Sequence, residues 1–164
     1  MGLQLPGELV SILGMLGYDW PTSDEEQLFR LGELWLSFAP QIEAAGAAAD
    51  MSAAQMWEQN QGEAVSAFQN WWKGEGNALD TLQQGVTGAT LVGAGLIVCA
   101  VIVLALKIQI IVQLVILAIQ IAQAIATAVA TFGASLLEIP IFKQITSMIL
   151  DQLVSMATEA VLNG

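Results

Sequence analysis

The sequence predicts an all-α protein: an acidic antiparallel helical hairpin followed by long apolar helices packed as a helical bundle. In the first half, apolar residues recur at alternating steps of three and four, the spacing of helices that pack on one another. In the second half, residues 81–106 and 108–137 contain no charged residue, and small residues recur at every fourth position. We therefore expect an acidic region over residues 1–80 and an apolar region over residues 81–164, coupled as one unit.

The two regions differ in charge. The 164 residues carry a net charge of −11, and every acidic residue except Glu138, Asp151 and Glu159 lies in residues 1–80. With only four Lys and Arg residues, the chain lacks the basic surface that nucleic acid requires, and it repels anionic lipid headgroups. We expect no nucleic-acid partner.

The sequence offers little material for catalysis. It contains no histidine, which excludes Ser-His and Cys-His nucleophiles and histidine metal sites, and its apolar runs hold no paired carboxylates. The glycines of "GVTGATLVGAG" are not followed by the GK[ST] of a phosphate-binding loop. Cys99, in "GLIVCAVIV", is interpreted as a small apolar filler. We predict no enzyme, no catalytic residue, no cofactor and no metal site.

Two helices are predicted before the hairpin bend. The first covers residues 5–16 and is ended by Gly17. In "PTSDEEQLF", Ser23 is the expected N-cap of the second helix, with Glu26 as its capping-box partner. Pro40 is expected to bend this helix without ending it. Its predicted packing seam is Leu28, Leu31, Trp35, Phe38, Ile42, Ala45 and Ala49.

A second seam follows and predicts the return helix of the hairpin. Every position of this seam is apolar except Glu75. Because the two seams flank residues 57–62, we expect an antiparallel hairpin that bends there. The seam comprises Val65, Phe68, Trp72, Leu79, Leu82 and Val86.

Two alternative structures are predicted for the apolar region. Around Lys107 the sequence "LALKIQI" has neither Gly nor Pro, which favours one continuous helix over about residues 78–132. Two ridges of small residues favour a hairpin folded at Lys107, because such ridges let helix backbones approach closely and this fold would bring them together in register. The ridges are Gly85, Ala89 and Gly93, and opposite them Ala118, Ala122, Ala126 and Ala130.

A polar stripe accompanies the second ridge. It consists of Gln109, Gln113, Gln120, Gln123, Thr127 and Thr131. One interpretation is a solvated or internally hydrogen-bonded edge of a helical bundle, and the other is a pore-lining face. Under the pore interpretation, Lys107 reaches an aqueous edge.

A break is predicted at "FGASLLEIPIF". Gly133 is suited to end one helix and Pro140 to begin the last one. The face predicted for this last helix is Ile145, Ile149, Leu153, Met156 and Ala160.

The stretch "MWEQNQGEAVSAFQNWW" and the apolar segment from "LVGAGLIVCAVIV" to "FGASLLEIPIF" resemble the WXG-like N-terminal domain of actinobacterial polymorphic toxins, as found in the CpnT channel-toxin family. The resemblance covers nearly the whole chain. It implies a helical, non-enzymatic leader domain that helps to export a C-terminal toxin by type VII secretion, and it assigns none of these residues to the toxin. Since no Lys or Arg precedes Arg30, a secretory signal peptide is not expected, and the implied location is secreted or in the cell envelope.

The sequence departs from the family pattern at two places. Trp57 and Gly62 are spaced W-x-x-x-x-G and not W-x-G. The family's export signal often contains Tyr-x-x-x-Asp/Glu after the hairpin, whereas the sole tyrosine, Tyr18, is followed at position 22 by Thr. An export signal would then lie elsewhere or come from a partner.

Within this resemblance, Trp57 and Gly62 are expected to shape the hairpin bend. Trp71 and Trp72 are expected to close the hairpin against the apolar helices, with an interfacial membrane belt as the alternative. The apolar surface exceeds what one hairpin can hide, so we expect self-association or a helical partner, including the type VII secretion machinery. The alternative function is an oligomeric membrane channel or pore-forming domain.

Overall fold

The computed structural model describes residues 2–163, and within this range it is all-α with no strand, as predicted. Two compact units form: Met1–Gln27 with Cys99–Gly164, and Leu28–Val98. The elements are α1 (Gly7–Met15), α2 (Glu25–Gln59), α3 (Glu63–Lys73), α4 (Ala78–Thr127), the 3-10 helix η1 (Ala134–Leu137) and α5 (Glu138–Asn163).

The start of α2 corrects the predicted cap by one residue. The backbone N–H of Gln27 donates to Asp24 Oδ1 at 3.1 Å, so Asp24 and not Ser23 caps the helix. From there α2 continues through Pro40, which is exposed and does not end it. The first helix, α1, lies within the predicted range, and Gly17 follows it with a positive φ of 82°.

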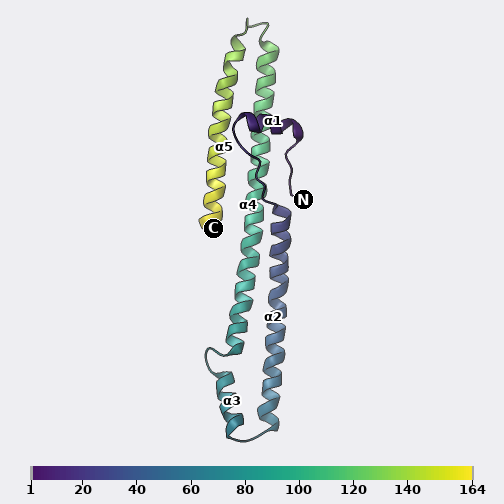
Figure 1. Cartoon of the computed structure of the whole chain (residues 1–164), viewed down its shortest axis with the longest axis vertical. Helices are drawn as coiled ribbons and strands as arrows, with labels where there is room; N and C mark the ends of the chain where they lie inside the picture. The colour runs from purple at the N-terminus through teal and green to yellow at the C-terminus, as the bar shows by residue number, and fades with distance from the viewer. Residues whose placement is uncertain (1, 164) are drawn as a thin grey trace. The chain divides into compact units, whose positions relative to one another are not determined.

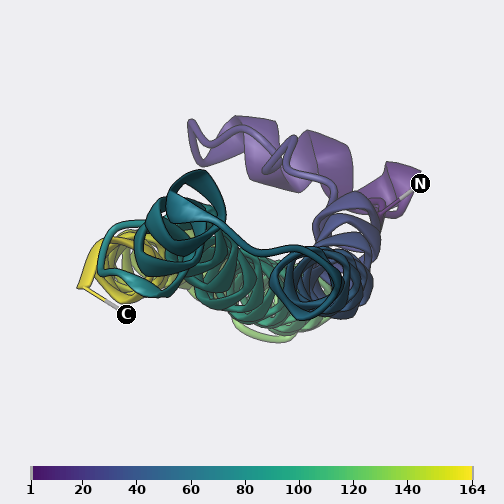
Figure 2. The same cartoon turned by 90° about the horizontal axis from the view of Figure 1, so that it is seen from below.

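In the unit Leu28–Val98, α2 packs antiparallel to the first part of α4 (Figures 1 and 2). The packing face of α2 differs from the predicted seam. Its buried positions are small residues at a heptad spacing, whereas Leu31, Trp35 and Phe38 are exposed. Small side chains let the two backbones approach, so they occupy the contact and the larger apolar neighbours remain outside it. The buried positions are Gly32, Ala39, Gly46 and Ala53.

The return arm of the hairpin is broken between α3 and α4, although the second seam predicted one helix there. Asn77 holds the break: its Nδ2 donates to the carbonyl oxygens of Trp72 and Gly74, and its Oδ1 accepts the N–H of Asp80 at 2.9 Å. Asp80 Oδ2 in turn accepts the N–H of Gly76 at 2.7 Å. Asn77 thus serves as the N-cap of α4 and ties it to the end of α3.

Helix α4 runs without interruption past Lys107, so the hairpin predicted at that residue is wrong. A helix without Gly or Pro at the proposed turn has no reason to leave the α-helical conformation there. The chain turns later, at the predicted break, where Gly133 has a φ of 85° and its N–H donates to the carbonyl oxygen of Ala128 at 2.7 Å. Pro140 lies in the first turn of α5, as predicted.

The core of the unit formed by Met1–Gln27 and Cys99–Gly164 lies where α1 packs on α4 and α5. Leu9 and Leu13 of α1 meet Leu114 of α4 and Leu150 of α5 in one buried cluster, together with Ile110. The inner face of α5 therefore differs from the predicted one. Thr146 and Leu150 are buried, Ile149 and Leu153 are half-buried, and Ile145 and Met156 are exposed.

Candidate functional site

The hairpin bend lies between the end of α2 and Gly62, which precedes α3. Gly62 has a φ of 132°, a conformation that favours glycine. Trp57 lies in the last turns of α2, and its ring centroid is 6.1 Å from that of Phe68 in α3. Lys73 Nζ lies 5.3 Å from the centre of the Trp57 ring, a cation–π distance. Trp57 therefore links the two helices on either side of the bend.

The two neighbouring tryptophans of α3 differ: Trp72 contacts α2, whereas Trp71 is mostly exposed to solvent. Trp72 Nε1 donates to Asp50 Oδ1 on α2 at 2.9 Å, and the Trp72 ring lies 5.7 Å from the Phe68 ring. Trp71 also contacts Phe68, at 6.0 Å, but most of its side chain is exposed. Trp72 thus fixes α3 on α2, whereas Trp71 presents an aromatic ring to the surroundings.

Two glycines bring α2 and α4 into backbone contact. A Cβ added to Gly93 would lie 2.8 Å from Leu36 Cγ and 2.9 Å from the carbonyl oxygen of Gly32. A Cβ added to Gly32 would lie 2.9 Å from the carbonyl oxygen of Gly93. Neither position can hold a side chain without moving backbone. The ridge that begins at Gly85 and contains the buried Ala89 therefore packs on α2, and not on a second half of α4.

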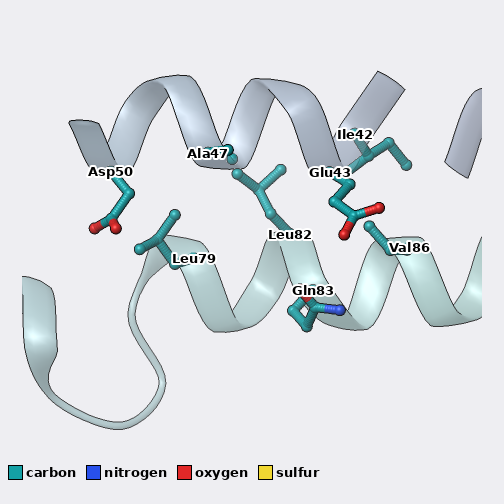
Figure 3. Close-up of a pocket in the computed structure, with 9 residues that line it drawn as sticks. Ile42, Glu43, Ala47, Asp50, Leu79, Leu82, Gln83 and Val86 are labelled. Atoms are coloured by element: carbon teal, nitrogen blue, oxygen red, sulfur yellow. The ribbon is translucent and has the colours of Figure 1, made fainter. Parts of the chain in front are cut away.

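A shallow groove of about 290 Å³ lies farther along the same interface (Figure 3). Gly46 and Ala47 of α2 line it, and Leu79 and Leu82 of α4 point toward α2. Glu43 and Asp50 also line it, so the groove combines apolar side chains with two carboxylates.

A second surface of α2 is apolar and exposed. The side chains of Leu31, Leu34, Trp35 and Phe38 line an open depression of about 460 Å³, together with the polar Ser37 and Gln41. The Trp35 and Phe38 rings meet edge to face at 6.2 Å. We call Leu31, Leu34, Trp35 and Phe38 the α2 apolar patch. Leu31, Trp35 and Phe38 belong to the predicted packing seam, but their exposure shows that the intramolecular packing predicted for them is wrong.

Lys107 is the one charged residue between positions 81 and 137, and it is buried at 1% exposure. Its Nζ donates to Glu25 Oε2 at 2.8 Å and to the carbonyl oxygen of Ser23 at 2.6 Å. The ring of Trp20 lies 5.7 Å away. The pore interpretation expected Lys107 to reach an aqueous edge. The burial of Lys107 contradicts that expectation. The ion pair was not predicted from the sequence, although a lone charge in an apolar run indicates a buried partner.

Around this pair, the N-terminal segment is held by polar contacts. Burial raises the pKa of Glu25, but hydrogen bonds from the Leu3 N–H and from Lys107 more than offset burial, so the pKa lies below its usual value. The Tyr18 hydroxyl bonds to Asp151 Oδ1 on α5, which raises the pKa of Tyr18, and lies 3.0 Å from the carbonyl oxygen of Ser147. The segment before α2 thus contacts both α4 and α5.

The second predicted ridge and the polar stripe lie on the later part of α4, except Ala130 and Thr131, which follow the end of this helix. Ala118 is half-buried, whereas Ala122, Ala126 and Ala130 are exposed. Of the stripe, Gln113 and Gln120 are half-buried, and Gln109, Gln123, Thr127 and Thr131 are exposed. The hydroxyl of Thr127 donates to the Gln123 carbonyl oxygen at 2.9 Å.

Two described segments are long and apolar enough to cross a membrane. The apolar windows in Glu63–Thr127 and Ala134–Asn163 have mean hydropathies of 2.7 and 1.3, and 17% and 11% of their residues are buried. The core helix of a soluble protein can have the same length and composition. Within residues 2–163, no group of three or more His, Cys, Asp or Glu is placed to hold a metal ion.

Comparison with known proteins identifies the family. A family model described as "WXG100 like domain" matches residues 4–149, which includes α1 to α4 and about half of α5. No curated protein and no solved structure matches the chain. Members of this family are helical, typically self-associate as helical hairpins and engage type VII secretion. The chain belongs to the WXG100-like domain family and is a helical protein related to type VII secretion.

Proposed function

We propose that this chain is the non-enzymatic leader domain of a type VII-secreted polymorphic toxin and that it acts in translocation through helical packing with other proteins. The main support for this proposal is the family match from residue 4 to residue 149, which covers the α2–α4 hairpin and most of the apolar region. The acidic region over residues 1–80 and the apolar region over residues 81–164 then act together. In this role Trp57 and Gly62 shape the bend of the hairpin.

The α2 apolar patch supports this function as a surface for a helical partner. Leu34 and Phe38 are exposed although each is large and apolar, and the Trp35 ring stands beside them. Exposed aromatic and aliphatic side chains grouped on one helix are typical of protein contact sites. Acidic Glu33 within the same stretch of α2 adds a charge that favours a partner with basic residues at the rim.

Export of a reporter tests the proposal. The chain is fused to the N-terminus of a reporter enzyme and expressed in a bacterium that has a type VII secretion system, and in the same strain with the secretion ATPase inactivated. We expect the reporter in the culture medium only when the system is active. Retention of the fusion in the cells of both strains, with the fusion intact and soluble, contradicts a leader role.

A matched pair of variants tests the role of the patch. Leu34→Arg places a charge in the α2 apolar patch, whereas Met51→Arg places the same charge on an equally exposed side chain of α2 outside it, at 64% against 63% exposure. We expect Leu34→Arg to lower export and Met51→Arg to leave it unchanged. Equal export by both variants would show that the patch is not the partner surface.

The second candidate is an oligomeric membrane channel, favoured by the low burial of both apolar windows. In this function the stripe from Gln109 to Thr131 faces the water of a pore formed by several copies. Planar-bilayer recordings test it: we expect discrete conductance steps, and a smaller unit conductance for Gln120→Leu. Absence of conductance, together with a monomer that stays soluble without detergent, contradicts the channel.

A further inference from the structure

The turn that joins α4 to α5 carries a set of exposed apolar side chains. Phe132 is fully exposed, Val129 is 89% exposed and Leu137 is 76% exposed. The turn lies at the end of the hairpin formed by α4 and α5 (Figure 1), and these apolar side chains are therefore exposed at one end of that hairpin. We call the apolar tip the exposed residues Ile125, Val129, Phe132, Leu136, Leu137 and Ile141.

Several polar groups of this turn form hydrogen bonds within it. The Thr131 hydroxyl donates to the carbonyl oxygen of Thr127 at 3.0 Å, and the buried Ser135 hydroxyl donates to the carbonyl oxygen of Ala124 at 2.7 Å. The hydroxyl of Thr127 bonds within α4. Backbone N–H groups that also have acceptors inside the turn are those of Thr131, Gly133, Ala134, Ser135 and Leu136. These groups need no water, which lowers the cost of bringing this part of the turn near hydrocarbon.

The backbone holds Phe132 in an unusual conformation. Its φ is 52°, and Phe132 is the one residue other than glycine with a positive φ in the described range 2–163. Bulky residues rarely adopt this conformation, and strained residues cluster at functional positions. Here the conformation accompanies a fully exposed aromatic ring at the end of the hairpin.

Charge limits how deep such a tip can enter a bilayer and which lipids it meets. The chain has no charged residue from position 108 to 137, and Glu138 is the first one after the turn. Glu138 is exposed at the start of α5, where it would stay in the headgroup region. With a net charge of −11, the protein is repelled by anionic lipids, so zwitterionic lipids are favoured.

We propose that the apolar tip is a membrane-contact site that inserts shallowly into zwitterionic bilayers with Phe132 foremost. This inference deepens the membrane candidate and rests on it. A bilayer fits better than a protein partner, because the apolar side chains are exposed at the end of a hairpin, several polar groups beside them are already hydrogen-bonded, and residues 108–137 offer no charge for a polar rim.

Flotation of the full chain with phosphatidylcholine vesicles tests the tip. We expect the parent to rise with the vesicles and Phe132→Asp to lower the partition coefficient by about tenfold, as expected for the loss of one buried aromatic side chain. Leu137→Asp should act in the same direction. The matched control is Leu162→Asp, because Leu162 is as exposed as Leu137, at 76%, and lies in the last turn of α5, away from the tip.

A labelled variant gives a second, direct readout. Cys99→Ala removes the one native thiol, and Phe132→Cys or Leu162→Cys then carries an environment-sensitive fluorophore. With vesicles we expect a blue-shifted emission from position 132 and an unchanged emission from position 162. Far-ultraviolet circular dichroism is used to check that each variant keeps its helices.

The outcomes separate the tip from the membrane candidate itself. If the parent floats and Phe132→Asp floats equally well, the tip proposal is wrong and the membrane candidate stands. If the parent does not float, both fall, while export remains a separate question. If Phe132→Asp instead lowers the mass of the protein in plain buffer or blocks export without affecting flotation, the tip binds a second copy or another protein, and the lipid proposal is overturned.

Discussion

Lys107 and Glu25 form the contact that most depends on single side chains. Both are buried, and Nζ and Oε2 are 2.8 Å apart. Removing one partner leaves the other charge buried, so we expect Lys107→Met or Glu25→Gln alone to lower the free energy of unfolding by about 3–5 kcal/mol. The double variant removes both charges and should lie closer to the parent.

Urea denaturation followed by circular dichroism measures this double-mutant cycle. Lys143→Met is the control, because Lys143 is half-buried on α5 and its loss should cost about 1 kcal/mol or less. A double variant as unstable as the sum of the single variants would show that the two side chains do not interact.

The same carboxylate predicts how stability changes with pH. The folded-state pKa of Glu25 lies below its usual value of about 4.3, so its contribution is present above that value and is lost as pH falls through the folded pKa. Asp24, whose pKa is lowered by the Gln27 N–H, acts in the same direction. We therefore expect the stability difference between the parent and Glu25→Gln to shrink between about pH 5 and about pH 3. A constant difference over this range would contradict the prediction.

The packing of α2 on α4 depends on the absence of side chains at two glycines. Gly93→Ala places a Cβ 2.9 Å from the carbonyl oxygen of Gly32, which can give way only if backbone moves. We expect the steric cost to exceed the helix-propensity gain of about 1 kcal/mol. The free energy of unfolding should therefore fall by about 1–3 kcal/mol. Thermal or urea unfolding measures it.

Two other glycines of α4 provide the control. A Cβ at Gly88 or at Gly95 meets nothing within 4 Å. Gly88→Ala and Gly95→Ala should therefore stabilise the helix by about 0.5–1 kcal/mol, because alanine has less backbone freedom to lose. If Gly93→Ala behaves like these two variants, α2 and α4 are not in close contact in solution.

The chain as a whole leaves many large apolar side chains exposed on α2, α4 and α5. Exposure of this extent favours association, and the family typically self-associates as helical hairpins. We expect light scattering to give a mass above that of a monomer in plain buffer and a lower one in mild detergent. Leu34→Arg should lower the mass in buffer if copies meet through the α2 apolar patch. A monomer in both solutions would contradict self-association.

Local signals in the sequence were enough for several of the helix ends. Gly17 and Gly133 each follow a helix with a positive φ, and Pro140 lies in the first turn of α5. "KGEGN" marks the break that the apolar seam obscured, because Asn77 caps α4 and Gly76 has a φ of 73°. Near Lys107 the missing Gly and Pro favoured the continuous helix, whereas the matching small residues suggested a turn that no local signal supported.

Composition and periodicity alone determined that the chain is helical, that its charge lies in the first half and that its second half is apolar, because these properties depend on neighbouring residues. Only the tertiary structure decided which helix faces meet. A ridge of small residues such as Gly85, Ala89 and Gly93 fits any helix that can approach closely, and it was α2, with Gly32 at the same level, that did so. Likewise, Lys107 has no partner within several turns of its own helix, so its burial depended on Glu25, which is 82 positions away in the sequence. Contacts between distant residues are set by the shape and charge of both surfaces, and one stretch of sequence describes only one of them.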